Sequence, residues 1–360
     1  MPKALARRSR LKRWNSFTYF FVYLHKVSIE LIKETEDKPT WQSFINQMNA
    51  LGSEKIPFIF IIDFEKKQPL IFRLDELPSN LFYSIQGKGT FPKTINSEKP
   101  LNFSRNPIDL EVYAQAFEKV KKEIDYGNTF LINLTFENEI QTNFSLLDIF
   151  NNCEAAYKLL YKDQFVVFSP ESFVQIKDYT ISTYPMKGTI NAAEDNAAQK
   201  ILANKKELFE HYTIVDLLRN DLNLVAKKVK VDKFRYLDKI ENNFGAILQV
   251  SSSISGKLPT DYHSQLGNIF DKLLPAGSIC GAPKKKTVEI IHEAEQRERG
   301  YYTGVFGVFD GENVDSAVMI RFIKKEKDKL FYCSGGGITF QSEVEKEFEE
   351  MKDKIYVPII

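Results

Sequence analysis

The sequence predicts an α+β fold, and three observations support this prediction. Strand-like segments occur in runs, with helices between only some of them, rather than in a regular strand–helix alternation. Residue types show no repeat with a period of 20–50 residues, which excludes solenoids and propellers. A chain of 360 residues with 43% hydrophobic and 27% charged residues has the composition of an ordinary globular protein.

The first half of the chain contains two strand runs separated by a helix. Residues 57–64 (PFIFIIDF) and 69–74 (PLIFRL) predict a pair of strands joined by a charged turn. Ile108–Gly127 predicts a helix, because apolar residues recur at helical spacing and a glycine follows them. The further predicted elements are a strand at Phe130–Phe136, a short helix at Ser145–Asn152, and three consecutive antiparallel strands at Phe165–Phe168, Phe173–Ile176 and Thr180–Thr183.

The second half mixes long helices with strands. Asp195–Leu222 predicts one long helical stretch, and Glu343–Ile355 predicts a closing helix. Between them lie predicted strands at Gly304–Phe309, Ala317–Phe322 and Leu330–Ser334.

Three regions are expected along the chain. Residues 1–47 begin with a run of basic residues followed by the short apolar stretch Phe17–Leu24, and Lys26 and Glu30 interrupt any continuation into a signal peptide. We therefore expect a basic, disordered leader, with Met48 as an alternative start. Residues 48–107 would form a short β-rich region, and residues 108–360 the main domain.

The bulk composition narrows the function classes. A formal net charge of +1 gives no indication of nucleic acid or a membrane surface as the main partner. No apolar run approaches the ~20 residues that a membrane span needs. Cys153, Cys280 and Cys333 form neither a metal-binding spacing nor an even disulfide framework, so a reducing cytoplasm is expected.

Two acidic pairs are the first candidates for a metal site. Glu207 and Glu210 lie three residues apart on one predicted helix, and Glu347 and Glu350 lie three apart on another. Residues at this spacing share a helix face, so each pair presents two carboxylates in one direction. Two such faces brought together would suit Mg²⁺, whereas each pair alone could equally be a solvated acidic face.

Glycine-rich and basic residues are candidates for anion binding. The segments 334–337 (SGGG), 275–278 (PAGS) and 281–284 (GAPK) would let backbone N–H groups approach an anion, or would simply form tight turns. Arg321 lies among apolar residues in a predicted strand and needs an anionic partner, either a ligand or a structural carboxylate. Lys187 could be an exposed lysine, or a nucleophile if burial or nearby cations lower its pKa.

Taken together, these segments resemble the chorismate-utilising family, which includes anthranilate, aminodeoxychorismate, isochorismate and salicylate synthases. The resemblance covers about residues 108–360 in the family's motif order. The matching segments are SPESF at 169–173, PMKGT at 185–189, KELFEHYTIVDLLRNDL at 206–222, PAGSICGAPKKKTVEII at 275–291, RGYYTGVFG at 299–307, SGGGI at 334–338 and EKEFEEMKDK at 345–354.

The resemblance implies a large α+β sandwich of antiparallel sheets, with helices outside and chorismate in a central cleft. It implies that Glu210 and Glu347 hold Mg²⁺, with Glu207 and Glu350 close by, and that the metal binds the ring carboxylate. The residues implied to hold the enolpyruvyl carboxylate or to line the same pocket are Arg321, Tyr302, Lys354, Gly335, Gly337, Ser278, Gly188 and Thr189.

Three positions favour one branch of the family. Lys187 occupies a position at which aminodeoxychorismate synthases carry lysine. In anthranilate and isochorismate synthases the residue at this position looks like alanine. Leu131 stands where isochorismate and salicylate synthases have a lysine base. Gln249 aligns with a histidine tied to pyruvate loss in the anthranilate branch, and glutamine cannot act as a general acid. The resemblance therefore implies amination of chorismate at C4, in the p-aminobenzoate and folate branch. Gln249 also departs from the pattern of the aminodeoxychorismate synthases themselves.

The implied mechanism has two displacements, with Lys187 as nucleophile at C2 and Glu171 as general acid and then base. A Glu171–Lys187 salt bridge is the structural alternative. No Gly-x-Cys-x-Gly nucleophile turn is present, so ammonia is expected from a separate glutaminase subunit in a heterodimer, or from solution. Anthranilate synthase component I and a degenerate chorismate-binding subunit remain the alternative functions.

Overall fold

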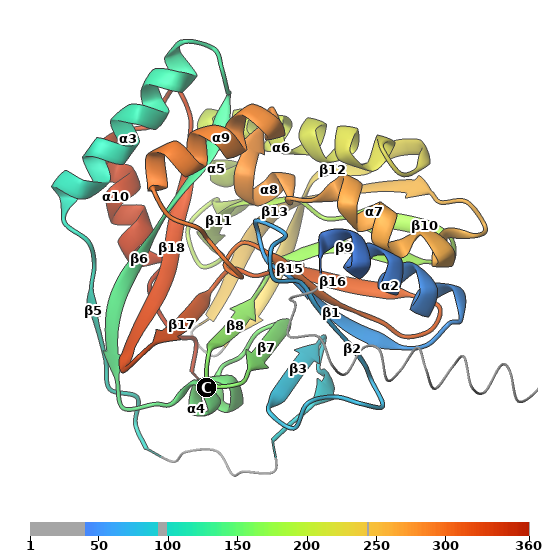
Figure 1. Ribbon diagram of the computed structural model, residues 1–360. Helices are drawn as coiled ribbons and strands as arrows, with labels where there is room; N and C mark the ends of the chain where they lie inside the picture. The colour runs from blue at the N-terminus through green and yellow to red at the C-terminus, as the bar shows by residue number, and fades with distance from the viewer. Residues whose placement is uncertain (1–39, 93–98, 243–244, 360) are drawn as a thin grey trace, which may run out of the picture. The chain divides into compact units, whose positions relative to one another are not determined.

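The fold is built on two antiparallel sheets, which confirms the predicted α+β class (Figure 1). The computed structural model describes residues 40–92, 99–242 and 245–359. Within them, the first nine-stranded sheet has the order β11-β13-β10-β9-β16-β15-β1-β2, with β12 paired to β13. Its strands are β1 Phe58–Ile62, β2 Leu70–Arg73, β9 Ser172–Lys177, β10 Thr180–Thr183, β11 Met186–Asn191, β12 Lys227–Asn242, β13 Gly245–Lys257, β15 Val305–Phe309 and β16 Val314–Val318.

The second sheet has the order β14-β6-β18-β17-β8-β7-β3-β4, with β5 paired to β6, and it also has nine strands among the described residues. Its strands are β3 Leu81–Ile85, β4 Lys88–Thr90, β5 Phe103–Asn106, β6 Leu131–Thr142, β7 Tyr157–Tyr161, β8 Phe165–Ser169, β14 Gly281–Ala282, β17 Phe322–Glu326 and β18 Lys329–Ile338. Each sheet contains strands from both halves of the chain, so neither half can form a complete sheet on its own.

The helices pack against the sheets and against one another. In Figure 1, α3, α9 and α6 run along one side of the molecule, and α10 packs against β18 and α3. The helical elements are α2 Trp41–Ser53, α3 Leu110–Asp125, α4 Leu146–Asn152, α5 Ala197–Ala203, α6 Lys205–Asn223, the 3₁₀ helix η1 Tyr262–Gln265, α7 Leu266–Leu273, α8 Gly277–Cys280, α9 Lys284–Glu295 and α10 Val344–Asp353. Among the described residues, no helix is long and apolar enough to cross a bilayer.

Two of the links by which the chain passes between the two sheets lie next to each other. Strand β8 continues into β9 through Pro170 and Glu171, and β16 continues into β17 through residues 319–321. The links are hydrogen bonded to each other, because Phe168 N donates to Arg321 O at 3.1 Å and Val318 N donates to Glu171 O at 3.1 Å. The two links, one carrying Glu171 and the other Arg321, are thus fixed side by side where the sheets meet.

This crossing corrects two of the expected strands. The strand expected at Ala317–Phe322 is interrupted, since β16 ends at Val318 and β17 begins at Phe322 in the other sheet. Arg321 has φ +52°, a left-handed conformation that a non-glycine residue rarely adopts within a strand. Phe165–Phe168 is a strand as expected, but it belongs to the second sheet and does not pair with β9.

The helix expected at Asp195–Leu222 is two helices. Helix α5 ends at Ala203, and Asn204 caps the start of α6 by accepting a hydrogen bond from Glu207 N at its side-chain oxygen (3.1 Å). Asparagine is a preferred N-cap residue, so the break follows from the local sequence. The cap sets the start of the helix that carries Glu207 and Glu210.

The boundary expected between residues 47 and 48 is wrong. Helix α2 runs across it, and Phe44, Ile45 and Met48 are 1%, 4% and 0% exposed in the core. Residues 48–107 do not form a separate region either, because β1 pairs with β15 and β3 pairs with β7. Residues 40–360 group as one compact unit. Residues 1–39 of the expected leader lie outside the described residues.

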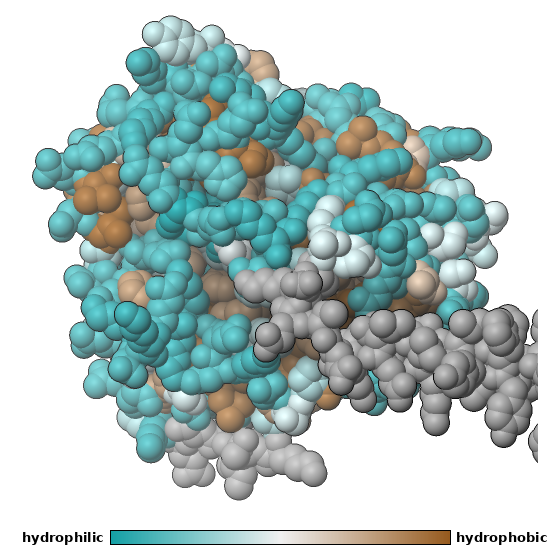
Figure 2. All heavy atoms as spheres, viewed as in Figure 1, coloured by the Kyte–Doolittle hydropathy of each residue, from teal (hydrophilic) through white to brown (hydrophobic). Residues whose placement is uncertain are grey.

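The surface carries no large apolar patch on the face shown in Figure 2, where hydrophilic atoms dominate and apolar atoms lie in small scattered groups.

The core is rich in aromatic residues. Tyr113, Phe117, Val120 and Ile124 of α3 are buried, as the helical spacing predicts, whereas Leu110 at the start of the same pattern is exposed. Sequence periodicity therefore located the buried face of this helix correctly.

Candidate active site

A cavity of about 910 Å³ lies at the crossing links and takes its walls from both sheets. Thirteen of the fourteen predicted site residues line it: Glu171, Lys187, Gly188, Thr189, Glu207, Glu210, Ser278, Tyr302, Arg321, Gly335, Gly337, Glu350 and Lys354. The remaining one, Glu347, is 2% exposed and lies one helical turn before Glu350 on α10. Motifs separated by up to about 180 residues are thus brought together at one site.

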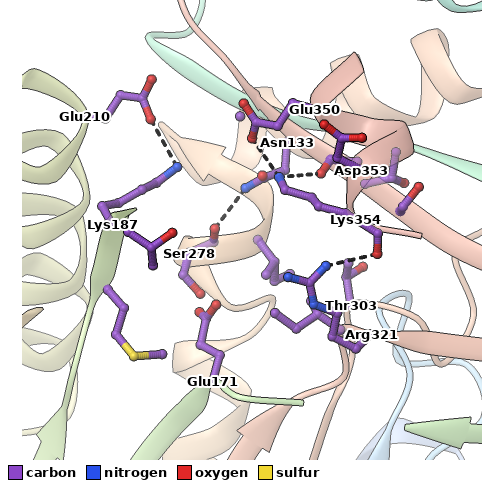
Figure 3. Close-up of a pocket in the computed structure, with 18 of the residues that line it drawn as sticks. Asn133, Glu171, Lys187, Glu210, Ser278, Thr303, Arg321, Glu350, Asp353 and Lys354 are labelled. Atoms are coloured by element: carbon purple, nitrogen blue, oxygen red, sulfur yellow. Dashed lines mark hydrogen bonds and ion pairs between the residues drawn. The ribbon is translucent and has the colours of Figure 1, made fainter. Parts of the chain in front are cut away.

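Lys187 is directed into the cavity by a bulge in β11. The pairing of β11 with β13 shifts register between Met186 and Thr189, and Gly188 has φ +80°. A glycine at positive φ is the usual means of inserting such a bulge and re-aiming a neighbouring side chain. Lys187 Nζ lies 3.1 Å from Glu210 Oε2, on the facing helix α6 (Figure 3).

The electrostatic setting of Lys187 differs from the expectation. A lowered pKa was expected from nearby cations, but the pKa of Lys187 is raised. Burial alone would lower it, yet attraction and hydrogen bonding to Glu210, with further attraction to Glu207 and Glu350, outweigh burial. The expectation failed because α6 places carboxylates, rather than cations, nearest to the amine. The alternative Glu171–Lys187 salt bridge is not what forms, since the amine pairs with Glu210.

Glu171 lies at the other side of the cavity base, in the first crossing link (Figure 3). Its backbone N–H is anchored on Ser169 Oγ at 3.1 Å. Burial raises the pKa of its carboxyl group, and a hydrogen bond with the Ser278 side chain and the charges of Lys187 and Lys354 offset only part of that rise. A carboxyl group with a raised pKa is suited to deliver a proton.

The basic residues of the cavity surround the β18 glycines. Lys354 Nζ donates to Gly335 O at 2.8 Å and pairs with Glu350 Oε1 at 2.8 Å. Burial lowers the pKa of Lys354, the charges of Lys187 and Arg321 lower it further, and Glu350 counteracts them. This cluster can attract an anionic ligand.

Arg321 has no structural carboxylate partner within the described part of the chain. Its Nη1 donates to Lys354 O at 3.0 Å, and its guanidinium lies 4.9 Å from the centre of the Tyr356 ring. Of the two partners considered for this arginine, the carboxylate side chain is therefore not observed. The guanidinium retains donors that can face an anion in the cavity.

The acidic pairs offer oxygen donors from two helices. Glu207 and Glu210 face the cavity from α6, and Glu350 faces it from α10. The point where a Cβ on Gly336 would lie is 3.6 Å from Glu350 Oε1 and 3.7 Å from Glu347 Oε2, so the second pair converges above this glycine. Carboxylate oxygens are the donors that Mg²⁺ prefers. Among the described residues, no three acidic side chains lie close enough together to form a metal site. The acidic pairs therefore suit Mg²⁺ by the chemistry of their oxygen donors and by their position at the cavity.

Asn133, Thr135 and Gln249 are polar residues that line the cavity and were not among the predicted site residues. Asn133 of β6 donates its Nδ2 to Ser278 O at 2.8 Å, and Thr135 follows on the same strand. The strand alternation provided a signal, because Leu131, Asn133 and Thr135 share one face of β6. Gln249 of β13 also lines the cavity, opposite Thr189 in the β11 register.

The cysteines are buried and free, which agrees with the absence of a glutaminase motif. Burial raises the pKa of Cys280 to about 11 and the pKa values of Cys153 and Cys333 to about 12. A thiol nucleophile acts as a thiolate, so these residues are unsuited to that role at neutral pH.

The sequence of this chain is similar to those of chorismate-binding enzymes, in agreement with the residues found at the cavity. Residues 14–359 match the family model of the chorismate binding enzymes. An uncharacterised PabA-like protein of Haemophilus influenzae is 51% identical over 89% of this chain and 98% of its own length. Aminodeoxychorismate synthase component 1 of Klebsiella aerogenes is 30% identical over 82% of this chain and 67% of its own length.

Solved structures show the same fold. The menaquinone-specific isochorismate synthase of Escherichia coli superposes with a TM-score of 0.63 at 17% identity, over 87% of this chain and 80% of its own. Anthranilate synthase component I of Streptococcus pneumoniae gives a TM-score of 0.58 at 25% identity, over 72% and 60%. Because the family model spans nearly the whole chain and the motif residues line one cavity, the chain belongs to the family of chorismate-binding enzymes.

Proposed function

We propose that the protein aminates chorismate at C4 to give 4-amino-4-deoxychorismate. The observation that carries this proposal is the placement of Lys187 and Glu171 on the walls of one cavity, where one can act as nucleophile and the other as acid. The similarity to aminodeoxychorismate synthase component 1 supports the same reaction.

The charges of the cavity suit a dianionic substrate. Arg321 and Lys354 would hold the enolpyruvyl carboxylate beside Gly335 and Gly337, with Tyr302 in the same wall. Glu210 and Glu347, assisted by Glu207 and Glu350, would hold Mg²⁺. The bound ion would neutralise the ring carboxylate and withdraw electrons from the ring.

The first displacement joins Lys187 to the substrate. The amine must lose its proton before it can attack, and the Glu210 carboxylate 3.1 Å away holds it in the charged form. Recruitment of Glu210 to another cation would release this amine, and its proton would then pass to solvent water. Lys187 Nζ then forms a bond to C2, the ring double bonds shift, and the C4–O bond breaks as Glu171 gives its proton to the departing hydroxyl group.

The second displacement installs nitrogen at C4. Ammonia forms a bond to C4, the double bonds shift back, and the C2–N bond to Lys187 breaks. Glu171, now ionised, accepts the proton that the new ammonium group loses. Gln249 can hydrogen-bond but cannot deliver a proton, so the enolpyruvyl group is retained.

The ammonia would come from a separate glutaminase subunit in a heterodimer. The raised pKa values of the three buried thiols support an external source. Their free state also supports the expected cytoplasmic setting.

Mass spectrometry of the product tests the proposal directly. The protein incubated with chorismate, Mg²⁺ and an ammonium salt should yield 4-amino-4-deoxychorismate without release of pyruvate. Anthranilate as the product would instead assign the chain to the anthranilate branch. Chorismate binding without any turnover would assign it as a binding subunit.

A further inference from the structure

Arg299 is a fully buried arginine that lies behind the cavity wall and does not line the cavity. All five of its N–H donors are used. Nε and Nη2 donate to the two oxygens of Glu295 at 3.0 and 2.6 Å, and Nη2 also donates to Asn133 O at 2.6 Å. Nη1 donates to Ile279 O at 3.0 Å and to Thr303 Oγ1 at 3.3 Å. The guanidinium is therefore fixed in one orientation.

Glu295 extends the same network to a second strand position. Its Oε1 accepts hydrogen bonds from Thr135 N and Thr135 Oγ1, both at 2.9 Å. The side chains of Glu295 and Arg299 are both 0% exposed. The pair thus joins β6, α8 and the turn at Thr303, which are three separate segments of the cavity wall.

The network continues to the predicted general acid. Asn133, whose carbonyl accepts from Arg299, donates its own Nδ2 to Ser278 O at 2.8 Å. The Ser278 side chain lies next to the carboxyl group of Glu171 (Figure 3), and hydrogen bonding from Ser278 is one of the effects that lower the pKa of this carboxyl group. Figure 3 shows Asn133, Ser278 and Glu171 following one another along the cavity.

A buried ion pair is weak evidence for stability, because an apolar pair of the same volume is often equally stable. An apolar pair cannot, however, supply the five directional hydrogen bonds that Glu295 and Arg299 make to these three segments. We propose that Glu295 and Arg299 are positioning residues, which hold Asn133 and Ser278 in place and, through Ser278, orient the Glu171 carboxyl group toward the substrate. The role of Glu171 in this inference rests on the proposed function.

The Arg299→Lys variant tests this inference, because lysine keeps the charge but cannot reach both carboxylate oxygens and two carbonyls from one nitrogen. We expect kcat per folded molecule to fall about 100-fold, because displacing a catalytic group by about 1 Å can reduce the rate by about that factor. The dissociation constant of chorismate, measured by calorimetry, should change less than about threefold, because the basic residues that bind it are untouched.

The pH profile supplies a readout that a purely structural role would not change. The Ser278 hydrogen bond lowers the pKa of Glu171, and Lys187 and Lys354 are the charged groups that act on it. Loss of this hydrogen bond should raise that pKa, so the pH at which kcat/KM declines should move upward in Arg299→Lys. An unchanged profile with a reduced folded fraction would overturn the inference.

The matched control is Asp315→Asn, which alters a part-buried carboxylate that accepts from Tyr157 Oη at 3.1 Å and does not line the cavity. It should change the unfolding midpoint but not kcat, KM or the pH profile.

A second variant, Thr303→Val, serves if Arg299→Lys does not fold. It removes the hydroxyl group that accepts a hydrogen bond from Arg299. It should still lower kcat roughly fivefold, which is the equivalent of one hydrogen bond. Normal kcat in Thr303→Val would then overturn the inference.

The wild-type protein is assayed first. If it binds chorismate but forms no amino product, the proposed function fails, and the positioning role is untouched by that result. In that case the positioning role is tested by calorimetry of chorismate binding to Glu295→Gln and Thr303→Val. A binding enthalpy that differs from that of Asp315→Asn supports the role, and identical enthalpies overturn it.

Discussion

Lys187 Nζ and Glu210 Oε2 lie 3.1 Å apart, which pairs the predicted nucleophile with a predicted metal ligand. The pair crosses the cavity from β11 to α6. The contact raises the pKa of the amine, so the proposed nucleophile and the proposed metal site are linked through Glu210. The predictions below follow from this arrangement and from the residues around it.

Glu210→Gln should reduce amination at least about 100-fold without unfolding the protein, because it removes one proposed Mg²⁺ ligand and the partner of Lys187. Glu347→Gln should have the same effect through the facing helix. Calorimetric titration with Mg²⁺ and a thermal unfolding curve provide the measurements. Glu118→Gln, on the exposed side of α3, is the control and should behave as the wild type. Normal Mg²⁺ affinity in both cavity variants would remove the metal assignment.

Chorismate supplied without ammonia should leave a covalent adduct on Lys187, because the second displacement cannot proceed. Mass spectrometry of the trapped and digested protein should place the added mass on the peptide around Pro185–Thr189. Lys187→Ala should form no adduct. If this variant aminates chorismate at the wild-type rate, the covalent route is not used, and Lys187 has an electrostatic role.

Glu171→Gln should lose activity and gain stability at neutral pH. Burial raises the pKa of Glu171 above its usual 4.5, so the folded protein binds more protons than the unfolded chain just above that pH. The stability of the wild type therefore decreases as the pH rises from 4.5 through the folded pKa. The difference in unfolding free energy between Glu171→Gln and wild type should grow over this window. Denaturant titrations at several pH values measure it, and a constant difference would contradict the raised pKa.

Gln249→His should permit slow loss of pyruvate from a bound intermediate, because histidine can deliver a proton where glutamine cannot. Gln249 lines the cavity opposite Thr189, which gives a new imidazole access to the substrate. A coupled lactate dehydrogenase assay detects the pyruvate. Stoichiometric pyruvate release by the wild type would show that the branch assignment is incorrect.

A chain beginning at Thr40 should fold and bind chorismate, whereas one beginning at Met48 should be strongly destabilised. Removing residues 40–47 exposes the contacts of Phe44 and Ile45, and each buried side chain of this size contributes about 1.5–3 kcal/mol. It also removes the hydrogen bond from Trp41 Nε1 to Asp271 Oδ1 (2.7 Å). Chemical denaturation of the two chains makes the comparison. Equal stability would show that the first half of α2 is dispensable.

Local sequence patterns located most elements, and thirteen of the fourteen site residues that the motifs and the family resemblance predicted line the cavity. The α3 face was largely correct, because four of the five apolar residues at helical spacing are buried and only Leu110, at the start of the helix, is exposed. The break at Asn204 and the crossing at residues 319–321 were missed, since one residue at a cap and one at positive φ interrupt patterns that otherwise look continuous. The boundary at residue 47 was misplaced because the apolar residues of α2 are few and are buried mainly by α7 and η1, from more than 200 residues away.

By itself, the sequence determined which residue types the site contains, since carboxylates, glycines and lysines occur in ordered motifs with fixed local spacing. Only the tertiary structure decided which charges meet. The bulge at Gly188 turns Lys187 toward Glu210, and this contact makes the pKa of the amine rise where the sequence suggested a fall. The buried Glu295–Arg299 pair likewise becomes meaningful only when its partners on β6 and α8 are known. Pairwise electrostatics depend on separations of a few ångströms between segments distant in the chain, and sequence spacing does not fix those separations.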